Sequence, residues 1–561
     1  MRGVPRLPWP AALTAAILGG LSLDLATPSF AWWPAAFVGT ALIHAAVWQQ
    51  RAWVGFGLGA AAGAAFWGPH ISWLTLYLGP VPWLGLCAVM VFWFALFGAG
   101  AALATTGLRK WARVDTGRPR LRLRWVLTAQ VLAVTGMWML REQVQSVWPY
   151  GGFAWGRLAH TQAESPLSAL VSWLGVSGLS ALVALACAVP VAACFALPSH
   201  RVKRATLATG AVGLALVSGA VVPPAALPVS GSITVAAVQG NAKSGIFDDR
   251  ENGDVIRVHL EETERLLDEL DAEGTQVDVI VWPENSGEFA LPDQFFRSEA
   301  VQRLAERADA PIVLGSVLED PDGTFTNSTI VVDGEGVTEL RYDKRRPVPF
   351  AEYMPNRSFF RALAPDLVDL VQLDYAHGTR PSVLEVPTRD GTIAAGIAIC
   401  FDIIFDDHAV AMMADAPSGG GAQVIFAQTN NADFGRTDES AQQLQIARLR
   451  AIETGRALVN ISTVGTSAIV DASGRDIAAL ETHVAGSMVA EVPLVSGRTP
   501  ALMLGAWIAG AWMLFGGLGG VLGAIGYFSG APPRRARSSS SRSARSSSSS
   551  SRVRRSSNMS Q

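Results

Sequence analysis

The sequence predicts a protein of two parts, an α-helical membrane region of about eight spans and an external α/β domain. Half of the 561 residues are hydrophobic and only 16% are charged, which is typical of membrane proteins. Long apolar segments fill residues 1–222 and 501–528, whereas residues 223–500 alternate short β-branched runs with amphipathic helices. The formal net charge of -3 gives no indication of a nucleic-acid partner.

Eight segments have the roughly 17 to 25 apolar residues that a membrane-spanning helix needs. They are residues 10–26, 31–49, 53–77, 82–107, 124–140, 166–197, 204–222 and 501–528. The first contains Asp24 and has features of a signal peptide, but it lacks a clear small-residue cleavage site. We therefore interpret it as a retained span and predict seven spans within residues 1–222.

The basic residues of the short loops predict the orientation, because Lys and Arg favour the cytoplasmic side. Arg2 and Arg6 precede the first span, Arg51 follows the second, and the basic segments 109–124 and 200–204 precede the fifth and seventh. The opposite loops "DLATPSF" and "LGPVP" carry no Lys or Arg. Residues 223–500 are then external, and the eighth span returns the chain to the cytoplasm.

The C-terminal segment, residues 529–561, is rich in Ser and Arg and poor in apolar residues. Such a composition cannot bury a core, which predicts a disordered, solvated tail. Its basic charge suits the anionic cytoplasmic face of a membrane. We expect no specific partner for it.

The external region has the alternating pattern of an α/β layer fold with buried strands. Strands are predicted at 232–241, 277–286, 311–317, 327–333, 392–400, 423–429 and 457–463, and helices at 251–274, 299–310 and 439–456. Several of these strands end in polar residues, which is where open α/β sheets place their sites.

Three polar residues near strand ends are the candidate catalytic groups. Glu284 follows the strand of "VIVWPENS", Lys344 lies in "RYDKRRPVPFAEYMP" together with Glu352, and Cys400 ends "TIAAGIAIC". A thiol attacks best as thiolate, so it needs a base, and a cation stabilises the oxyanion that its attack creates. Alone, each residue has an ordinary structural explanation: a solvated glutamate, a basic surface, a core cysteine. Together they form a nucleophile, a base and a cation.

The other cysteines, Cys87, Cys187 and Cys194, lie in long apolar segments, where cysteine behaves as a small hydrophobic residue. The four cysteines show no paired spacing, no CxxC and no accompanying histidine cluster. We therefore predict neither a disulfide framework nor a metal site.

The local sequences around these candidates resemble a known superfamily. "WPEN", "YDKRRPVPFAEYMP" and "CFD", in this order, are similar to motifs of the carbon–nitrogen hydrolase (nitrilase) superfamily. With the apolar segments before and after them, and with "AVQGN", "TNNADFG" and "SVWPYGGFAWGRLAHTQ", the chain resembles the apolipoprotein N-acyltransferase family. The resemblance covers nearly all of residues 10–528 and implies a nitrilase-like αββα sandwich.

The resemblance also implies roles for individual residues. Glu284 would be the general base, Lys344 the residue that stabilises the oxyanion, and Cys400 the nucleophile. Glu352 resembles an additional active-site glutamate of the family, and Asp402 would support the site.

The sequence departs from the family at two places. Phe401 and Asp402 stand where the family often has Tyr and Glu after the cysteine. Asp433 stands in "TNNADFG" where the family often has tryptophan in a loop that contacts lipid.

The reaction that the resemblance implies is a transfer in two steps without a cofactor. Cys400 takes an acyl chain from a membrane phospholipid as a thioester, and the α-amino group of a diacylglyceryl-modified apolipoprotein then accepts it. The implied location is the bacterial cytoplasmic membrane, with a monomer as the default. Segment 357–371 suits either a membrane-facing interfacial helix or a helix packed on the sheet.

Two other functions are alternatives to the acyl transfer. A membrane-anchored amidase would have the same triad with water as second nucleophile, although one span would anchor it. A transporter with an external ligand-binding domain would need intramembrane charge, and the spans offer little beyond Asp24 and His70.

Overall fold

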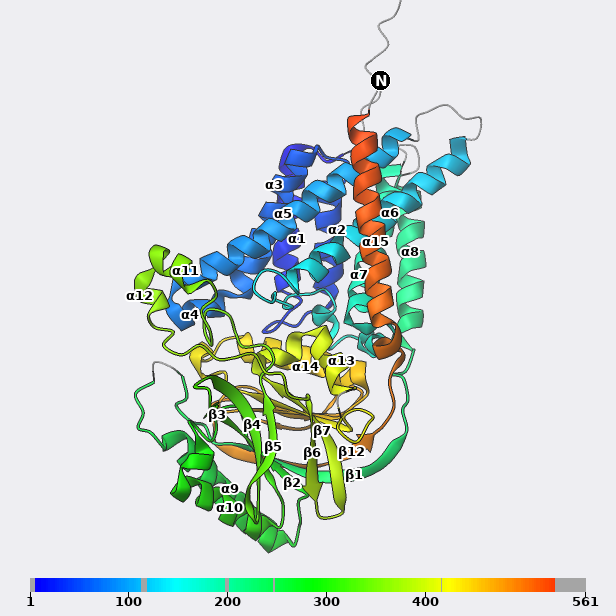
Figure 1. The fold of residues 1–561 in the computed structure, drawn as a ribbon. Coiled ribbons are helices and arrows are strands. Elements are labelled where there is room, and N and C mark those ends of the chain that lie inside the picture. Colours follow the sequence, from blue (N-terminus) through cyan, green and yellow to red (C-terminus); the bar gives the residue numbers. More distant parts are fainter. Residues whose placement is uncertain (1–5, 112–118, 197–200, 246–247, 415, 530–561) are drawn as a thin grey trace, which may run out of the picture.

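The computed structural model describes residues 6–111, 119–196, 201–245, 248–414 and 416–529, and has a helical part stacked on a two-sheet part (Figure 1). The predicted tail, residues 529–561, lies outside the described residues except for Ser529. The helical part contains N-terminal residues together with the last long helix, so segments far apart in sequence, such as Pro80–Trp111 and Pro500–Phe528, lie side by side.

Each of the eight predicted apolar segments corresponds to a helix of at least 14 residues. They are α1 (Trp9–Asp24), α2 (Pro34–Val47), α3 (Ala52–His70), α5 (Pro80–Trp111), α6 (Pro119–Gln145), α7 (Val171–Ala196), α8 (Arg201–Ala220) and α15 (Pro500–Phe528). Among the described residues, four stretches are long and apolar enough to cross a membrane: Pro80–Lys110, Leu123–Gln145, Ser168–Ala196 and Pro500–Phe528. The other predicted spans form helices that are shorter or less apolar.

Small residues allow these helices to approach closely. A Cβ atom added to Gly107 of α5 would lie 1.8 Å from the carbonyl oxygen of Gly523 in α15, and one added to Gly136 of α6 would lie 2.3 Å from the Gly516 nitrogen. Backbone contact through small residues is how helices associate in lipid, where burial of apolar surface gives no driving force. The last helix is thereby packed against α5 and α6.

The second part consists of two six-stranded sheets. One has the order β12-β1-β2-β3-β4-β5 and the other β11-β10-β9-β8-β7-β6. The strands of the first sheet are β1 (Val229–Gln239), β2 (Val279–Val281), β3 (Ile312–Glu319), β4 (Phe325–Asp333), β5 (Gly336–Asp343) and β12 (Gly486–Val495). Those of the second are β6 (Val383–Thr388), β7 (Gly391–Ile399), β8 (Val424–Thr429), β9 (Leu458–Ser462), β10 (Ser467–Val470) and β11 (Asp476–Leu480).

The two sheets are built on the same plan. In each, three neighbouring strands are parallel, β1-β2-β3 in one and β7-β8-β9 in the other, and antiparallel strands extend both sides. The sequence pattern predicted the parallel strands, which are buried on both faces. It missed β5, β6, β10, β11 and β12, since these flanking strands are shorter or partly exposed and lack a continuous hydrophobic run.

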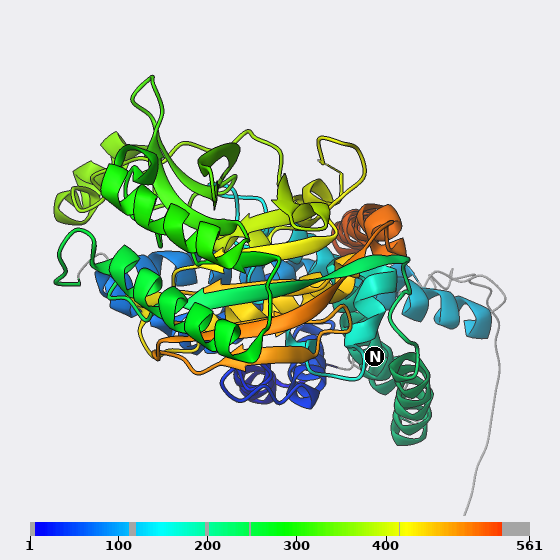
Figure 2. The same ribbon diagram turned by 90° about the horizontal axis from the view of Figure 1, so that it is seen from below.

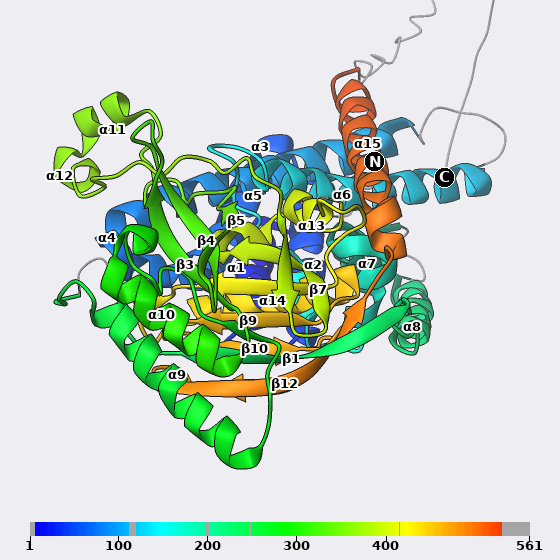
Figure 3. The ribbon, with the colours of Figure 1, turned by 60° about the horizontal axis from the view of Figure 1, so that its bottom comes forward.

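Helices cover both outer faces of the paired sheets, which confirms the αββα sandwich. On one side lie α9 (Asp254–Glu273) and α10 (Phe295–Ala308), seen from below in Figure 2. On the other side α13 (Asp406–Met412) and α14 (Glu439–Thr454) lie between the sheets and the helical part (Figures 1 and 3). One hydrophobic core joins residues of α14, the second sheet and the long helices, so the two parts are packed together.

Segment 357–371 is neither one helix nor packed on a sheet. It forms α11 (Arg357–Leu363) and α12 (Pro365–Val368), which lie beside the helical part (Figure 1). The break falls at Ala364 because the ring of a following proline disfavours helical geometry at the preceding residue. Phe359 and Leu363 are exposed, whereas Phe360 packs against Tyr150.

Candidate functional site

Glu284 is held in the interior just beyond the end of β2. It follows Trp282 and Pro283, and its side chain is only 3% exposed. Gly315 of the neighbouring strand β3 permits this position, because a Cβ atom there would lie 2.8 Å from the Glu284 Cα. The local sequence thus directs a carboxylate inward, and Glu284 is not a solvated strand-end residue.

Lys344 lies between two carboxylates immediately after β5. Its Nζ is 2.9 Å from Oε1 of Glu284 and 2.9 Å from Oε1 of Glu352, and the side chain is 1% exposed. Asn327 of β4 joins the same group, since its Nδ2 donates to Glu284 at 2.8 Å and to Glu352 at 2.9 Å. The second oxygen of Glu352 accepts from the Val348 N–H at 2.7 Å. The ammonium of Lys344 is therefore held by both carboxylates.

The charges of this cluster determine which protonation states it favours. Burial opposes the charge of Lys344, yet the carboxylates of Glu284 and Glu352 raise its pKa well above the usual value. Burial raises the pKa of Glu284, while Lys344 acts to lower it and Glu352 to raise it further. The lysine therefore remains a cation, and Glu284 is a stronger base than a solvated glutamate.

Cys400 stands where β7 ends and a 3-10 turn, Cys400–Ile404, begins. Its backbone has φ of +48°, which is uncommon for a residue with a side chain and is often found at functional turns. The residue as a whole is partly exposed, and Gln443 Nε2 donates to its sulfur at 3.5 Å. Cys400 is therefore not a core residue of the strand.

The thiol lies within electrostatic reach of Glu284 and Lys344. Burial raises the pKa of Cys400 well above the usual value, the charge of Glu284 raises it further, and Lys344 acts to lower it. A thiol in this state attacks only when a neighbouring group removes its proton. The structure brings such a group, Glu284, to the same site.

Asp402 links the turn of Cys400 to the segment of Lys344. Its carboxylate is fully buried and accepts hydrogen bonds from the Tyr342 hydroxyl at 2.7 Å, the Arg346 N–H at 2.9 Å and the Ile399 N–H at 3.2 Å. Two of these donors flank Lys344, and the third precedes Cys400. Asp402 thus positions the two candidate residues relative to each other and does not itself face a substrate.

Sequence reasoning missed three further polar residues of the site, Asn327, Gln443 and Glu439. Asn327 lies inside a buried strand, where an amide has no recognisable pattern, whereas Gln443 and Glu439 lie on α14 next to the "TNNADFG" loop. The buried run of polar residues on that amphipathic helix is a signal that could have indicated them.

The helical part reaches the residue next to Cys400. Phe401 stacks on Phe153 with ring centroids 6.3 Å apart, and Trp155 stacks on Phe153 in turn. Phe434 of the "TNNADFG" loop meets Trp73 edge to face at 5.0 Å. Apolar rings from both parts of the chain therefore surround this side of Cys400.

A charge network, in which two fully buried arginines meet the partly exposed Asp406, also joins the two parts. Arg157, which precedes α7, donates to both oxygens of Asp406 at 2.8 and 2.9 Å. Arg450 of α14 donates to the same Asp406 at 2.7 Å and to the carbonyl oxygens of Ile403 and Ile404 in the Cys400 turn at 3.1 and 2.7 Å. The position of Cys400 therefore depends on both parts.

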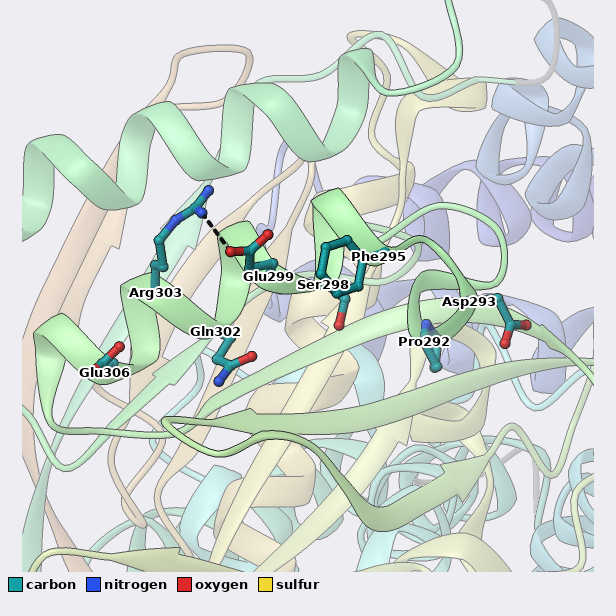
Figure 4. A pocket seen from close by; sticks show the side chains of 8 residues that line it. All are labelled: Pro292, Asp293, Phe295, Ser298, Glu299, Gln302, Arg303 and Glu306. Carbon is teal, nitrogen blue, oxygen red and sulfur yellow. Dashed lines mark ion pairs between the residues drawn. The ribbon is translucent and has the colours of Figure 1, made fainter.

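Two other features lie apart from this cluster. Within the described residues, no group of three or more His, Cys, Asp or Glu side chains is arranged to hold a metal ion. A surface hollow of about 430 Å³ runs along α10 (Figure 4), between Pro292 and Glu306, where Glu299 and Arg303 form an exposed ion pair. It contains none of the candidate residues.

The chain is similar to known proteins over most of its length. Residues 19–189 match the family model "Apolipoprotein N-acyltransferase N-terminal domain", and residues 234–499 match "Carbon-nitrogen hydrolase". The apolipoprotein N-acyltransferase of Mycolicibacterium smegmatis is 31% identical, with 94% of this chain and 88% of the relative covered. That of a Pseudomonas aeruginosa strain is 28% identical, with 92% and 98% covered. A solved amidase from Nesterenkonia sp. is 17% identical with a TM-score of 0.33, and the match covers 50% of this chain and 95% of the amidase.

Proposed function

This chain belongs to the apolipoprotein N-acyltransferase family, and on that premise we propose that Cys400, Glu284 and Lys344 carry out its acyl transfer. The protein is an acyltransferase of lipoprotein maturation with a carbon–nitrogen hydrolase domain. The observation that supports the assignment most strongly is the cluster in which Lys344 bonds to Glu284 and Glu352, within electrostatic reach of the Cys400 thiol.

In the first step the sulfur of Cys400 attacks the ester carbonyl of a membrane phospholipid. Glu284 accepts the thiol proton as the S–C bond forms, and the ammonium of Lys344 stabilises the negative oxygen of the tetrahedral intermediate. The ester C–O bond then breaks, and the departing alkoxide takes the proton back from Glu284. The products are a Cys400 thioester and a lysophospholipid.

In the second step the α-amino group of the diacylglyceryl-cysteine of an apolipoprotein attacks the thioester. The N–C bond forms, the C–S bond breaks, and a proton from the nitrogen passes through Glu284 to the thiolate. The amide product is more stable than the thioester, which drives the transfer forward. No cofactor takes part in either step.

The acyl chain would extend from Cys400 along the apolar rings that surround it. Phe401, Phe153 and Trp155 form a stacked series that leads from the nucleophile toward the helical part. Because both substrates are anchored in a bilayer, a nucleophile that faces the helical part can reach them without extracting them from lipid.

We further propose a topology of eight spans in the bacterial cytoplasmic membrane. Residues 1–222 would form seven spans, 223–500 an external catalytic domain and 501–528 the eighth span, with the tail 529–561 in the cytoplasm. Two observations support this assignment. Lys and Arg are concentrated in alternate loops, which favours a cytoplasmic location for those loops, and each predicted span corresponds to a helix. We propose a monomer, because the triad lies within one chain.

Reporter fusions test this topology. A reporter enzyme that works only in the cytoplasm should be active when it is fused after Gln561. A reporter that works only outside the cytoplasm should be active when it is inserted near Asp320, in the loop after β3. An insertion in the basic segment near Asp115 serves as a second cytoplasmic control. If the reporters after Gln561 and near Asp320 detect the same side, the number of spans is wrong by one.

Mass spectrometry of a lipoprotein N-terminus tests the function itself. In cells with this protein the terminal cysteine should carry three acyl chains, one of them as an amide, and in cells without it only the two ester-linked chains. Complementation with the wild-type chain should restore the third. An N-terminus that keeps its free amine after complementation would contradict the proposed activity and favour an amidase that uses water.

A further inference from the structure

The turn that begins with Cys400 is held by contacts at its C-terminal end. Cys400 is the first residue of the 3-10 turn, and its φ of +48° lies in a region that residues with a side chain rarely adopt. Such a conformation persists only where the surrounding structure fixes it. Arg450 supplies two of the contacts, since its guanidinium donates to the carbonyl oxygens of Ile403 and Ile404 at 3.1 and 2.7 Å. The end of the turn is therefore tied to the position of this arginine.

Asp406, which follows the turn, joins Arg450 to a second arginine. Arg450 Nη2 donates to Asp406 Oδ1 at 2.7 Å, and Arg157 Nη1 donates to both carboxylate oxygens at 2.8 and 2.9 Å. The two arginine side chains are fully buried, whereas the Asp406 side chain is partly exposed. An unbroken series of contacts therefore leads from Arg157 through Asp406 and Arg450 to the backbone of the turn.

This series starts in the helical part. Arg157 lies between α6 and α7, and its Nη2 donates to Ser177 Oγ of α7 at 2.7 Å. A second link to α7 starts from α14, because Glu453 Oε1 accepts from the Val176 N–H at 3.1 Å while its Oε2 pairs with Arg450. The start of α7 is therefore linked to both arginines that hold Asp406.

We propose that Arg157 is a positioning residue, which acts through Asp406 to hold the turn of Cys400 in its reactive conformation. The helical part thereby sets the reactivity of the thiol. The role rests on the proposed function, since it takes Cys400 as the nucleophile. A small displacement is enough for a large effect, because a shift of about 1 Å that originates far from the chemistry can slow a reaction by about 10²-fold.

The arginines act on Cys400 through contacts, not through their charge. The charged groups that affect the pKa of Cys400 most are Glu284, Lys344 and Glu439. Partial burial acts to raise the pKa of Asp406, but the charges of the two arginines lower it below the usual value. A carboxyl group with a lowered pKa stays ionised at neutral pH, so the network should hold the turn equally from about pH 6 to about pH 9.

The variant Arg157→Met tests the proposal, because it removes the charge and the donors but keeps a long unbranched side chain. Purified full-length protein is mixed with p-nitrophenyl butyrate, a soluble ester, and the burst of p-nitrophenolate is followed. The amplitude of the burst counts the active molecules, and its rate measures attack by Cys400. The rate should fall by about 10-fold, by the same factor across the neutral pH range. Single-turnover acylation by labelled phospholipid should slow by that factor as well. A purely structural role would lower the amplitude and leave the rate unchanged.

A double-variant cycle shows whether Arg157 acts through Asp406. Asp406→Asn should slow the burst at least as much as Arg157→Met, and the two changes together should slow it no further than Asp406→Asn alone, because both break the same contact. Arg157→Lys keeps the charge and should recover part of the rate. Arg303→Met makes the matched change at an exposed position of α10 and should behave as wild type.

The possible outcomes separate this role from the proposed function. An unchanged burst rate in Arg157→Met would overturn the positioning role, as would losses that multiply in the double variant. A loss seen with phospholipid but not with the soluble ester would also overturn it, since it would assign Arg157 to lipid binding. A wild-type burst without any acyl-enzyme from phospholipid would contradict only the proposed function, and absence of any wild-type burst or adduct would overturn both.

Discussion

Protein carrying Cys400→Ala is expected to form no covalent adduct with labelled phospholipid, and lipoproteins in cells that depend on it should keep a free N-terminal amine. The physical reason is that Cys400 supplies the atom that bonds to the acyl carbon, and alanine offers none. Wild-type protein incubated with phospholipid in the absence of acceptor should retain the label, and hydroxylamine should release it as expected for a thioester. Gel fluorography or intact-protein mass spectrometry measures the adduct.

Two matched variants sharpen this experiment. Cys400→Ser should be nearly as inactive as the alanine variant, because a carboxylate removes a proton from a thiol far more readily than from a hydroxyl. Cys194→Ala changes another free cysteine, in α7, and should label like the wild type. Label that remains on Cys400→Ala would falsify the assignment of the nucleophile.

The variant Lys344→Met is expected to lose both activity and stability. Without the cation, the buried Glu284 and the partly buried Glu352 would be joined only through Asn327, with like charges at close range. One of them must then take up a proton, and the oxyanion loses its stabilising charge. Acylation should slow by about 10²–10³-fold or more, and the free energy of unfolding should fall by about 3–5 kcal/mol, typical of a broken buried ion pair.

The rate of acylation is measured by labelling with phospholipid for set times before quenching, and the stability is measured by thermal unfolding in detergent. Lys243→Met is a suitable control, since it makes the same change at an exposed lysine of the same domain and should alter neither quantity appreciably. The double variant Lys344→Met with Glu352→Gln should recover part of the stability, because it removes one of the opposed charges, but none of the activity. Normal acylation by Lys344→Met would contradict the role of this lysine and leave the oxyanion to other donors.

The sequence by itself predicted the elements and the candidate residues that local patterns encode. Apolar length identified eight helices, four of which are long and apolar enough to cross a membrane, and continuous β-branched runs identified the parallel strands. Polar residues after such strands indicated Glu284, Lys344 and Cys400, because the carboxyl ends of buried strands are where side chains leave the core. The resemblance of the local motifs to a known family predicted the sandwich fold and the family itself, and the family comparisons support both.

Only the tertiary structure decided how these residues meet. The contact of Lys344 with both glutamates, the bridge made by Asp402 and the network from Arg157 to the Cys400 turn join residues from different strands and helices. The break of 357–371 at Ala364 and the flanking strands β5, β6, β10, β11 and β12 also became visible only there. Periodicity records which face of an element is buried, but not which element lies opposite, since that depends on sheet order, register and side-chain packing between distant segments.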